Sequence, residues 1–132
     1  IKTTDVNVRL LGRIDAEQLS CLLADSDIYV HVSHIENSPN SVCEAMMVGM
    51  PVIASYAGGT GSMLKNEKEG LLVQDGDPYA YAGALIRLYK DFGYAKTLGQ
   101  SARETALVRH DAKRVVAQLI NAYQDILKNK QI

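Results

Sequence analysis

Features that mark several classes of protein are missing from this chain of 132 residues. It has no basic run or stripe and its formal net charge is −1, so it offers no surface for nucleic acid, whose phosphates require clustered lysine and arginine. No apolar stretch approaches the roughly 20 residues that a membrane-spanning helix needs. The sequence begins at Ile1 in a polar context and shows no signal-peptide pattern. We therefore expect no nucleic-acid partner and a cytoplasmic location.

Metal ligands are also scarce. Cys21 and Cys43 belong to no CxxC pair and have no histidine at a zinc-site spacing. Both lie in apolar periodic segments, so we expect them to be small core residues in a reducing compartment. His31 and His34 lie on either side of Ser33, at a spacing that two metal ligands could use, but no third ligand is obvious. The sequence therefore predicts no metal site and no cofactor.

The residues that are present predict one α/β domain covering residues 1–132. The chain is 47% hydrophobic, which is enough for a real core. Short, apolar, β-branched runs alternate with segments of helical periodicity. The expected strands are Val6–Leu11, Asp27–Val32, Val52–Ser55 and Gly70–Val73. This alternation is typical of a parallel sheet covered by helices on both faces, so we predict a Rossmann-like sheet.

Capping residues mark the ends of the expected helices. Asp15 and Asp111 can accept hydrogen bonds from free first-turn amides, and Pro78 suits the first position of a helix. The expected helices are Ala16–Ala24, Ser41–Val48 closed by Gly49, one from Pro78, one over about Tyr94–Val108, and a last one after Asp111. In the helix that begins at Pro78, we expect Tyr81, Leu85, Leu88 and Tyr89 to be buried. In the last helix, we expect Tyr123 to be buried.

Ligands bind such sheets at the carboxyl ends of the strands, which directs attention to the loops after Leu11, Val32 and Ser55. The loop after Ser55 contains Gly58-Gly59-Thr60-Gly61. These glycines could let the backbone approach a sugar or an acceptor, or they could form a turn that needs positive φ. Their place at the end of a strand favours the functional interpretation.

The loop after Val32 contains two carboxylates around a helix start. Glu36 lies just outside the helix, Pro39-Asn40-Ser41 opens it, and Glu44 lies about one turn inside. Unpartnered first-turn amides and the helix dipole make this N-terminus an anion site. Ionised carboxylates beside it are natural acceptors for sugar hydroxyls. A diphosphate between two sugars, as in a nucleotide-sugar, would satisfy the whole stretch.

By itself this spacing has a second interpretation. The chain has 15 acidic residues, and acids near a helix start stabilise the helix without binding anything. The flanking residues decide between the two, because they form a longer pattern. The pattern consists of Ser33, Glu36, Pro39-Asn40, Glu44-Ala45-Met46, Gly49, Pro51–Ser55 and Gly58-Gly59, continued by Gly70–Val73 and Gly76-Asp77-Pro78 and preceded by Leu11-Gly12 and Ala24–Asp27.

In combination, these residues resemble the retaining glycosyltransferases of the glycosyltransferase group 1 family, which have the two-domain GT-B fold. The resemblance covers nearly the whole chain. It departs from the family pattern at two places. The common Gly-Phe after the first glutamate is Asn37-Ser38 here, and the frequent Pro-Glu after the glycine pair is Gly61-Ser62. Both departures lie near the donor, so we expect them to affect donor preference.

The resemblance implies a role for each residue of the loop. Glu36 would contact the transferred sugar, and Glu44 would hold the ribose hydroxyls. The backbone of Pro39-Asn40-Ser41 would contact the diphosphate, and that of Gly58-Gly59 would lie near the sugar. Gly12-Arg13 would lie near the nucleobase. Members of this family need no metal.

The resemblance also implies a larger enzyme, of which this chain is the C-terminal, donor-binding part. The family's first βαβ unit, with its phosphate-binding arginine and lysine, is absent, and so is the N-terminal acceptor domain. We therefore expect weak donor affinity and no transfer by these residues alone. Peripheral membrane association of the full-length enzyme stays open. So do two other functions, a GT-B-like nucleotide-sugar epimerase and a non-catalytic nucleotide-sugar-binding module.

Overall fold

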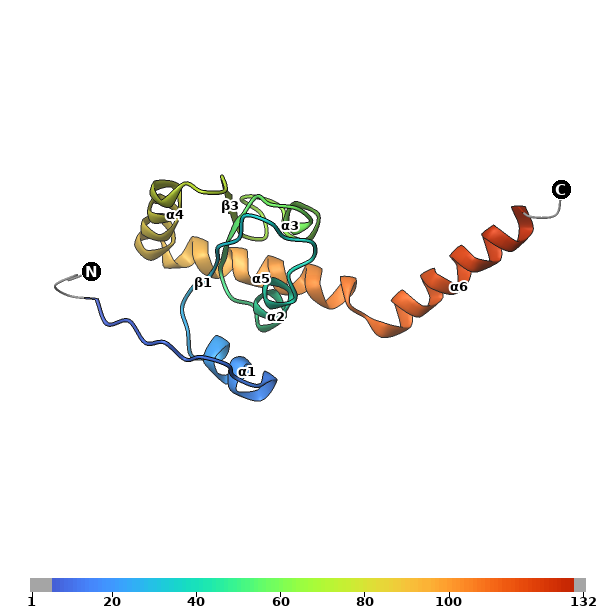
Figure 1. Cartoon of the computed structure of the whole chain (residues 1–132), viewed down its shortest axis with the longest axis horizontal. Coiled ribbons are helices and arrows are strands. Elements are labelled where there is room, and N and C mark those ends of the chain that lie inside the picture. The colour runs from blue at the N-terminus through green and yellow to red at the C-terminus, as the bar shows by residue number, and fades with distance from the viewer. Residues whose placement is uncertain (1–5, 130–132) are drawn as a thin grey trace.

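The computed structural model describes residues 6–129, in which three short parallel strands pack among six helices (Figure 1). In chain order the elements are α1 (Ala16–Ala24), β1 (Tyr29–His31), α2 (Asn40–Val48), β2 (Val52–Ser55), α3 (Thr60–Met63), β3 (Leu71–Val73), α4 (Pro78–Lys90), α5 (Phe92–Arg109) and α6 (Ala112–Asn129). This arrangement confirms the predicted α/β class.

The sheet has the strand order β1-β2-β3, with every pair parallel. Tyr29 lies opposite Val52, and Ile53 lies opposite Leu71. Successive side chains of a strand point to opposite faces. Accordingly, Val52 belongs to one hydrophobic cluster and its neighbour Ile53 to another. The sheet therefore has a core on each face, as the short apolar strands predicted.

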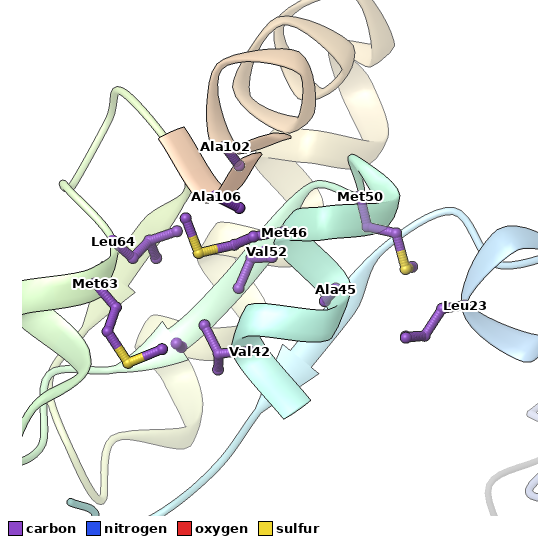
Figure 2. Close-up of a cluster of buried hydrophobic side chains, with 11 residues drawn as sticks. Leu23, Val42, Ala45, Met46, Met50, Val52, Met63, Leu64, Ala102 and Ala106 are labelled. Atoms are coloured by element: carbon purple, nitrogen blue, oxygen red, sulfur yellow. The ribbon is translucent and has the colours of Figure 1, made fainter. Parts of the chain in front are cut away.

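Helices from both sides complete these two cores. On one face, α1, α2, α3 and the second half of α5 surround Met46 and Leu64 (Figure 2). On the other face, α4 and the first half of α5 surround Leu88 and Leu98. The helices α2 and α5 pack closely, since a Cβ on Gly99 would lie 2.2 Å from the carbonyl oxygen of Gly49. Only glycine permits that approach.

The predicted helix caps are present. Asp15 accepts a hydrogen bond from the Gln18 amide at 2.8 Å and forms a capping box. Asp111 accepts from the Arg114 amide at 2.7 Å. Pro78 occupies the first turn of α4, and Gly49 ends α2 with φ +90. These local signals therefore placed the helix ends correctly to within one or two residues.

The predicted strand Val6–Leu11 is wrong. This segment forms no strand, and Val8 and Leu10 are 72% and 92% exposed. An extended segment becomes a strand only when its amides and carbonyls pair with a neighbour. Among residues 6–129 the sheet contains β1, β2 and β3 alone, and the N-terminal segment runs apart from it (Figure 1). The segment Val6–Leu11 has the apolar pattern of a strand, but none of the three described strands pairs with it.

Several side chains predicted to be buried are exposed. In α4, Tyr81 and Leu88 are buried, but Leu85 is at the surface and Tyr89 is 84% exposed. The helix packs through one stripe, and Tyr89 lies beyond it. Cys21 is also exposed, while Cys43 is half-buried. The buried stripe of α4 is therefore narrower than the sequence pattern predicts.

The last helix, α6, extends away from the remainder of the described residues (Figure 1). None of its side chains is buried, and Tyr123, predicted to be in the core, is exposed. Its exposed apolar side chains are Val115, Val116, Leu119, Ile120, Tyr123, Ile126 and Leu127. Between residues 6 and 129, no helix combines the length and apolarity that crossing a bilayer requires.

Candidate functional site

The candidate site lies where β1 and β2 end side by side. Ser55, the last residue of β2, is fully buried and binds the backbone of Ser33 twice. Its hydroxyl accepts from the Ser33 amide at 3.1 Å and donates to the Ser33 carbonyl at 2.7 Å. These bonds fasten the start of the loop between β1 and α2, which contains Glu36, to the carboxyl end of the sheet.

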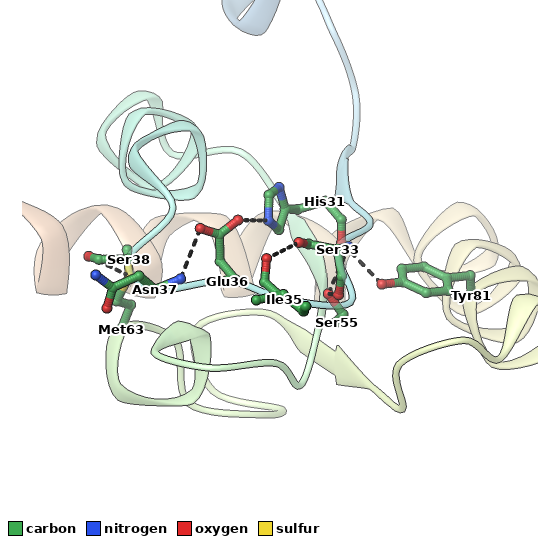
Figure 3. Close-up of polar contacts among 9 residues, drawn as sticks. All are labelled: His31, Ser33, Ile35, Glu36, Asn37, Ser38, Ser55, Met63 and Tyr81. Carbon is green, nitrogen blue, oxygen red and sulfur yellow. Dashed lines mark hydrogen bonds and ion pairs between the residues drawn. The ribbon is translucent and has the colours of Figure 1, made fainter.

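The Glu36 side chain is held at both of its oxygen atoms (Figure 3). Its Oε2 lies 3.1 Å from Nε2 of His31, and its Oε1 accepts a hydrogen bond of 3.1 Å from the Asn37 amide. The side chains of Glu36 and His31 are 24% and 15% exposed. The carboxylate is thus anchored at both oxygen atoms and still partly exposed. Such a group can still accept hydrogen bonds from a ligand.

The glycine-rich loop after β2 presses against this loop. A Cβ on Gly58 would lie 1.5 Å from the Glu36 carbonyl oxygen, and one on Gly59 would lie 1.9 Å from that of Asn37. Gly58 also has φ +51, which favours glycine. The structure therefore gives this glycine pair a definite packing role: it lets the two loops meet at Glu36.

The N-terminus of α2 follows directly and lacks a side-chain cap. Pro39 is the N-cap residue, buried, and makes no side-chain hydrogen bond. Asn40 and Ser41 form the first turn, and the Val42 and Cys43 amides bond back to the Pro39 carbonyl. An uncapped start leaves earlier amides available to an anion, and the helix dipole favours one there. The structure confirms the helix start that the sequence predicted at Pro39-Asn40-Ser41, and the binding of an anion there stays a prediction.

Glu44 lies one turn further along α2 and is exposed. It borders a cavity of about 250 Å³ between α1 and α2. The other residues around this cavity are Ala16, Leu19, Ser20, Leu23, Cys43, Met47 and Val48. The Glu44 side chain makes no hydrogen bond or ion pair with any residue from 6 to 129. Its carboxylate is therefore free to accept from a ligand.

Gly12 and Arg13, which the resemblance implies lie near the nucleobase, precede α1, and that role stays a prediction. Both are exposed in the segment before α1, and Gly12 has φ +65 with open space around it. Arg13 borders a separate surface hollow with Glu17 and Gln18. Within residues 6–129, no hydrogen bond or ion pair joins either residue to Glu36 or to α2. The strand expected to position them does not form.

His31 is the site residue that the sequence did not assign. Its spacing from His34 suggests a metal pair at most, and residues 6–129 contain no group of three or more histidine, cysteine, aspartate or glutamate residues that could hold a metal. Its place as the last residue of β1, five positions before Glu36, was visible in the sequence. What the sequence could not show is that the loop turns back and brings Glu36 onto the imidazole.

The comparisons with known proteins agree with this geometry. Residues 2–105 match the family model described as glycosyl transferases group 1. The chain belongs to this family. It is 28% identical over 129 residues to N-acetyl-alpha-D-glucosaminyl L-malate synthase of Bacillus anthracis, which covers 98% of this chain and 34% of that protein. The chain therefore spans about a third of the length of this relative.

Two solved structures share the fold. Sucrose-phosphate synthase from Thermosynechococcus elongatus superposes with a TM-score of 0.80 at 32% identity, over 91% of this chain and 30% of the other. HepE of Anabaena, in complex with UDP, gives a TM-score of 0.75 at 26% identity, over 79% and 29%. HepE has also been solved in complex with UDP-glucose. The structural neighbours are GT-B glycosyltransferases, and the chain is similar to part of each.

Proposed function

We propose that this chain is the donor-binding part of a retaining glycosyltransferase, of the hexosyltransferase type, in glycan or glycolipid biosynthesis. It would receive a nucleotide-diphosphate sugar whose sugar is then transferred to an acceptor. The observation that carries the proposal is the anchored Glu36 carboxylate beside the uncapped N-terminus of α2. The similarity to HepE, which binds UDP and UDP-glucose, supports the same ligand class.

In this proposal the groups at the site have separate tasks. Glu36 accepts hydrogen bonds from the transferred sugar and orients it, and Glu44 accepts from the ribose hydroxyls. The first-turn amides of α2, at Asn40 and Ser41, bind the diphosphate. Negative charge grows on that diphosphate as the glycosidic bond breaks. Oriented N–H groups stabilise charge where it develops, which lowers the barrier to transfer.

The acceptor contacts would lie elsewhere in the same protein. The chain spans 34% of the length of its Bacillus anthracis relative, which leaves room for an acceptor domain and for further phosphate-binding groups. We accordingly propose that residues 1–132 bind the donor weakly by themselves and transfer no sugar. Measurable transfer by the isolated chain would contradict this.

Substitution of the two glutamates in the full-length enzyme tests the proposal. Glu36→Ala should lower the turnover number by about 100-fold, because a charged hydrogen-bond acceptor is lost from the reacting sugar. Glu44→Ala should raise the KM for the donor by about tenfold and change turnover less. The readout is release of the nucleoside diphosphate from UDP-, GDP- or ADP-sugars in the presence of acceptor.

Glu104→Ala is the matched control, because Glu104 is an exposed glutamate on α5 outside the site. It should leave both constants unchanged. A Glu36→Ala enzyme with a normal turnover number would remove the main site assignment. An unchanged donor KM in Glu44→Ala would count against the ribose role alone.

A further inference from the structure

His31 makes contacts outside the sheet through both its backbone and its side chain. Its carbonyl oxygen accepts a hydrogen bond of 3.1 Å from the hydroxyl of Tyr81, which reaches across from α4 (Figure 3). Its ring stacks on that of Tyr29, with centroids 6.5 Å apart and planes 21° from parallel. The backbone of His31 is therefore tied to α4, and its imidazole lies against the ring of Tyr29.

Glu36, in contrast, lies on a loop between two exposed neighbours. Its neighbour Ile35 is 92% exposed, and Asn37 is exposed as well. A glutamate on such a loop would sample several rotamers if nothing held it. Two contacts prevent this: the Asn37 amide at Oε1 and the His31 imidazole at Oε2, each at 3.1 Å.

These two contacts differ in what they can control. The Asn37 amide belongs to the residue next to Glu36 and moves with the loop. His31 belongs to β1 and fixes the carboxylate relative to the sheet and to the start of α2. An ionised carboxylate only accepts hydrogen bonds, so the proton in this contact sits on Nε2 of His31. Each carboxylate oxygen retains a lone pair for a sugar hydroxyl.

We propose that His31 is a positioning residue: it orients the Glu36 carboxylate so that it receives the sugar of the donor. This inference rests on the proposed function. His31 acts through Glu36 and does not touch the ligand itself. A group displaced slightly from its productive position loses much of its effect. Loss of the His31 contact should therefore weaken binding of the sugar and leave binding of the nucleotide unchanged.

Paired ligands test this in the full-length protein. UDP lacks the sugar and UDP-glucose carries it, so the ratio of their dissociation constants isolates the sugar contact. Isothermal titration of the wild type would also use GDP with GDP-mannose and ADP with ADP-glucose, and would continue with the pair that binds best. His31→Ala should reduce the preference for the sugar-bearing ligand about fivefold, the effect of one hydrogen bond, with unchanged affinity for the free diphosphate.

A double-mutant cycle separates positioning from a general structural effect. In a Glu36→Ala background, His31→Ala should change the ratio by less than about twofold, because its partner is already gone. His31→Gln, whose amide can donate to the carboxylate, should recover at least about half of the logarithmic loss. His110→Ala is the matched control, since His110 is exposed beyond the end of α5.

Each result decides the proposal. Equal losses from His31→Ala with and without Glu36 would overturn it, as would an unchanged ratio in His31→Ala when Glu36→Ala lowers it. In both cases the proposed function would stand. If Glu36→Ala leaves the ratio unchanged, or if none of the three ligand pairs binds, the proposed function fails and the role of His31 fails with it.

Discussion

The middle of the molecule and its two flanking segments contain the same kinds of apolar side chains, but they differ in how many of these side chains are buried. In residues 29–109, which we call the central region, all of β2, Leu71 and Val73 of β3 and one stripe of each helix are buried. In the flanking segments, residues 6–24 and 112–129, only Leu23 is buried. Burial requires a complementary surface as well as a pattern, and only the central region supplies both. Three pairs of residues test it: two compare the central region with a flanking segment, and one compares two positions inside the central region.

Leu88 and Leu119 form the first pair and carry the largest expected effect. Leu88 in α4 is fully buried, whereas Leu119 in α6 is 52% exposed. Leu88→Ala should lower the free energy of unfolding by about 2–5 kcal/mol, since it removes buried methyl groups and leaves a cavity. Leu119→Ala should change it by less than about 0.5 kcal/mol. Urea unfolding followed by circular dichroism measures both, and equal losses would show that α6 is packed.

Gly99 and Gly83 form the second pair, with an intermediate effect. Both lie inside helices, but a Cβ on Gly99 would meet the Gly49 carbonyl oxygen, whereas one on Gly83 meets nothing within 4 Å. Gly99→Ala should destabilise by about 2 kcal/mol because α2 and α5 must separate. Gly83→Ala should stabilise by up to about 1 kcal/mol through helix propensity. Two variants with the same sign would refute the close crossing of α2 and α5.

Cys43 and Cys21 form the third pair, and they are compared by the rate at which iodoacetamide modifies each thiol. Cys43 in α2 is half-buried and Cys21 in α1 is exposed. Burial raises the pKa of the Cys43 thiol above its usual value, an effect that Arg109 partly offsets. A raised pKa leaves less of the reactive thiolate at a given pH. Iodoacetamide at pH 8 should therefore modify Cys21 before Cys43, as peptide mass spectrometry would detect; the opposite order would contradict the assigned burial.

Much of the fold could be predicted because its signals are local. Asp15 and Asp111 cap their helices as expected, Gly49 ends α2, and β2 covers the predicted Val52–Ser55. The segment Val6–Leu11 failed because strand formation depends on a neighbour that a local pattern does not reveal. Tyr89 failed for a related reason, since the width of a buried stripe depends on the surface that faces it.

The candidate site also has parts that the sequence predicted and parts that only the structure shows. Glu36, the first turn of α2 and Glu44 lie within nine consecutive residues, and the structure places them around one helix start as the sequence predicted. Their roles toward a ligand stay predictions. Gly58 and Gly59 were interpreted either as a ligand approach or as a turn, and the structure adds a third reason, their contact with the backbone of Glu36 and Asn37.

The sequence by itself determined the α/β class, the starts of the longer helices and the family, because each of these depends on periodicity, capping and order along the chain. It did not reveal the short helix α3 (Thr60–Met63), which lies partly in the predicted glycine-rich loop. Only the tertiary structure decided which apolar stripes are buried and how Glu36 is held. The bond from Tyr81 to His31 spans 50 positions, and the bonds between Ser33 and Ser55 span 22. Contacts at such separations follow from strand register and helix packing, which no local pattern specifies.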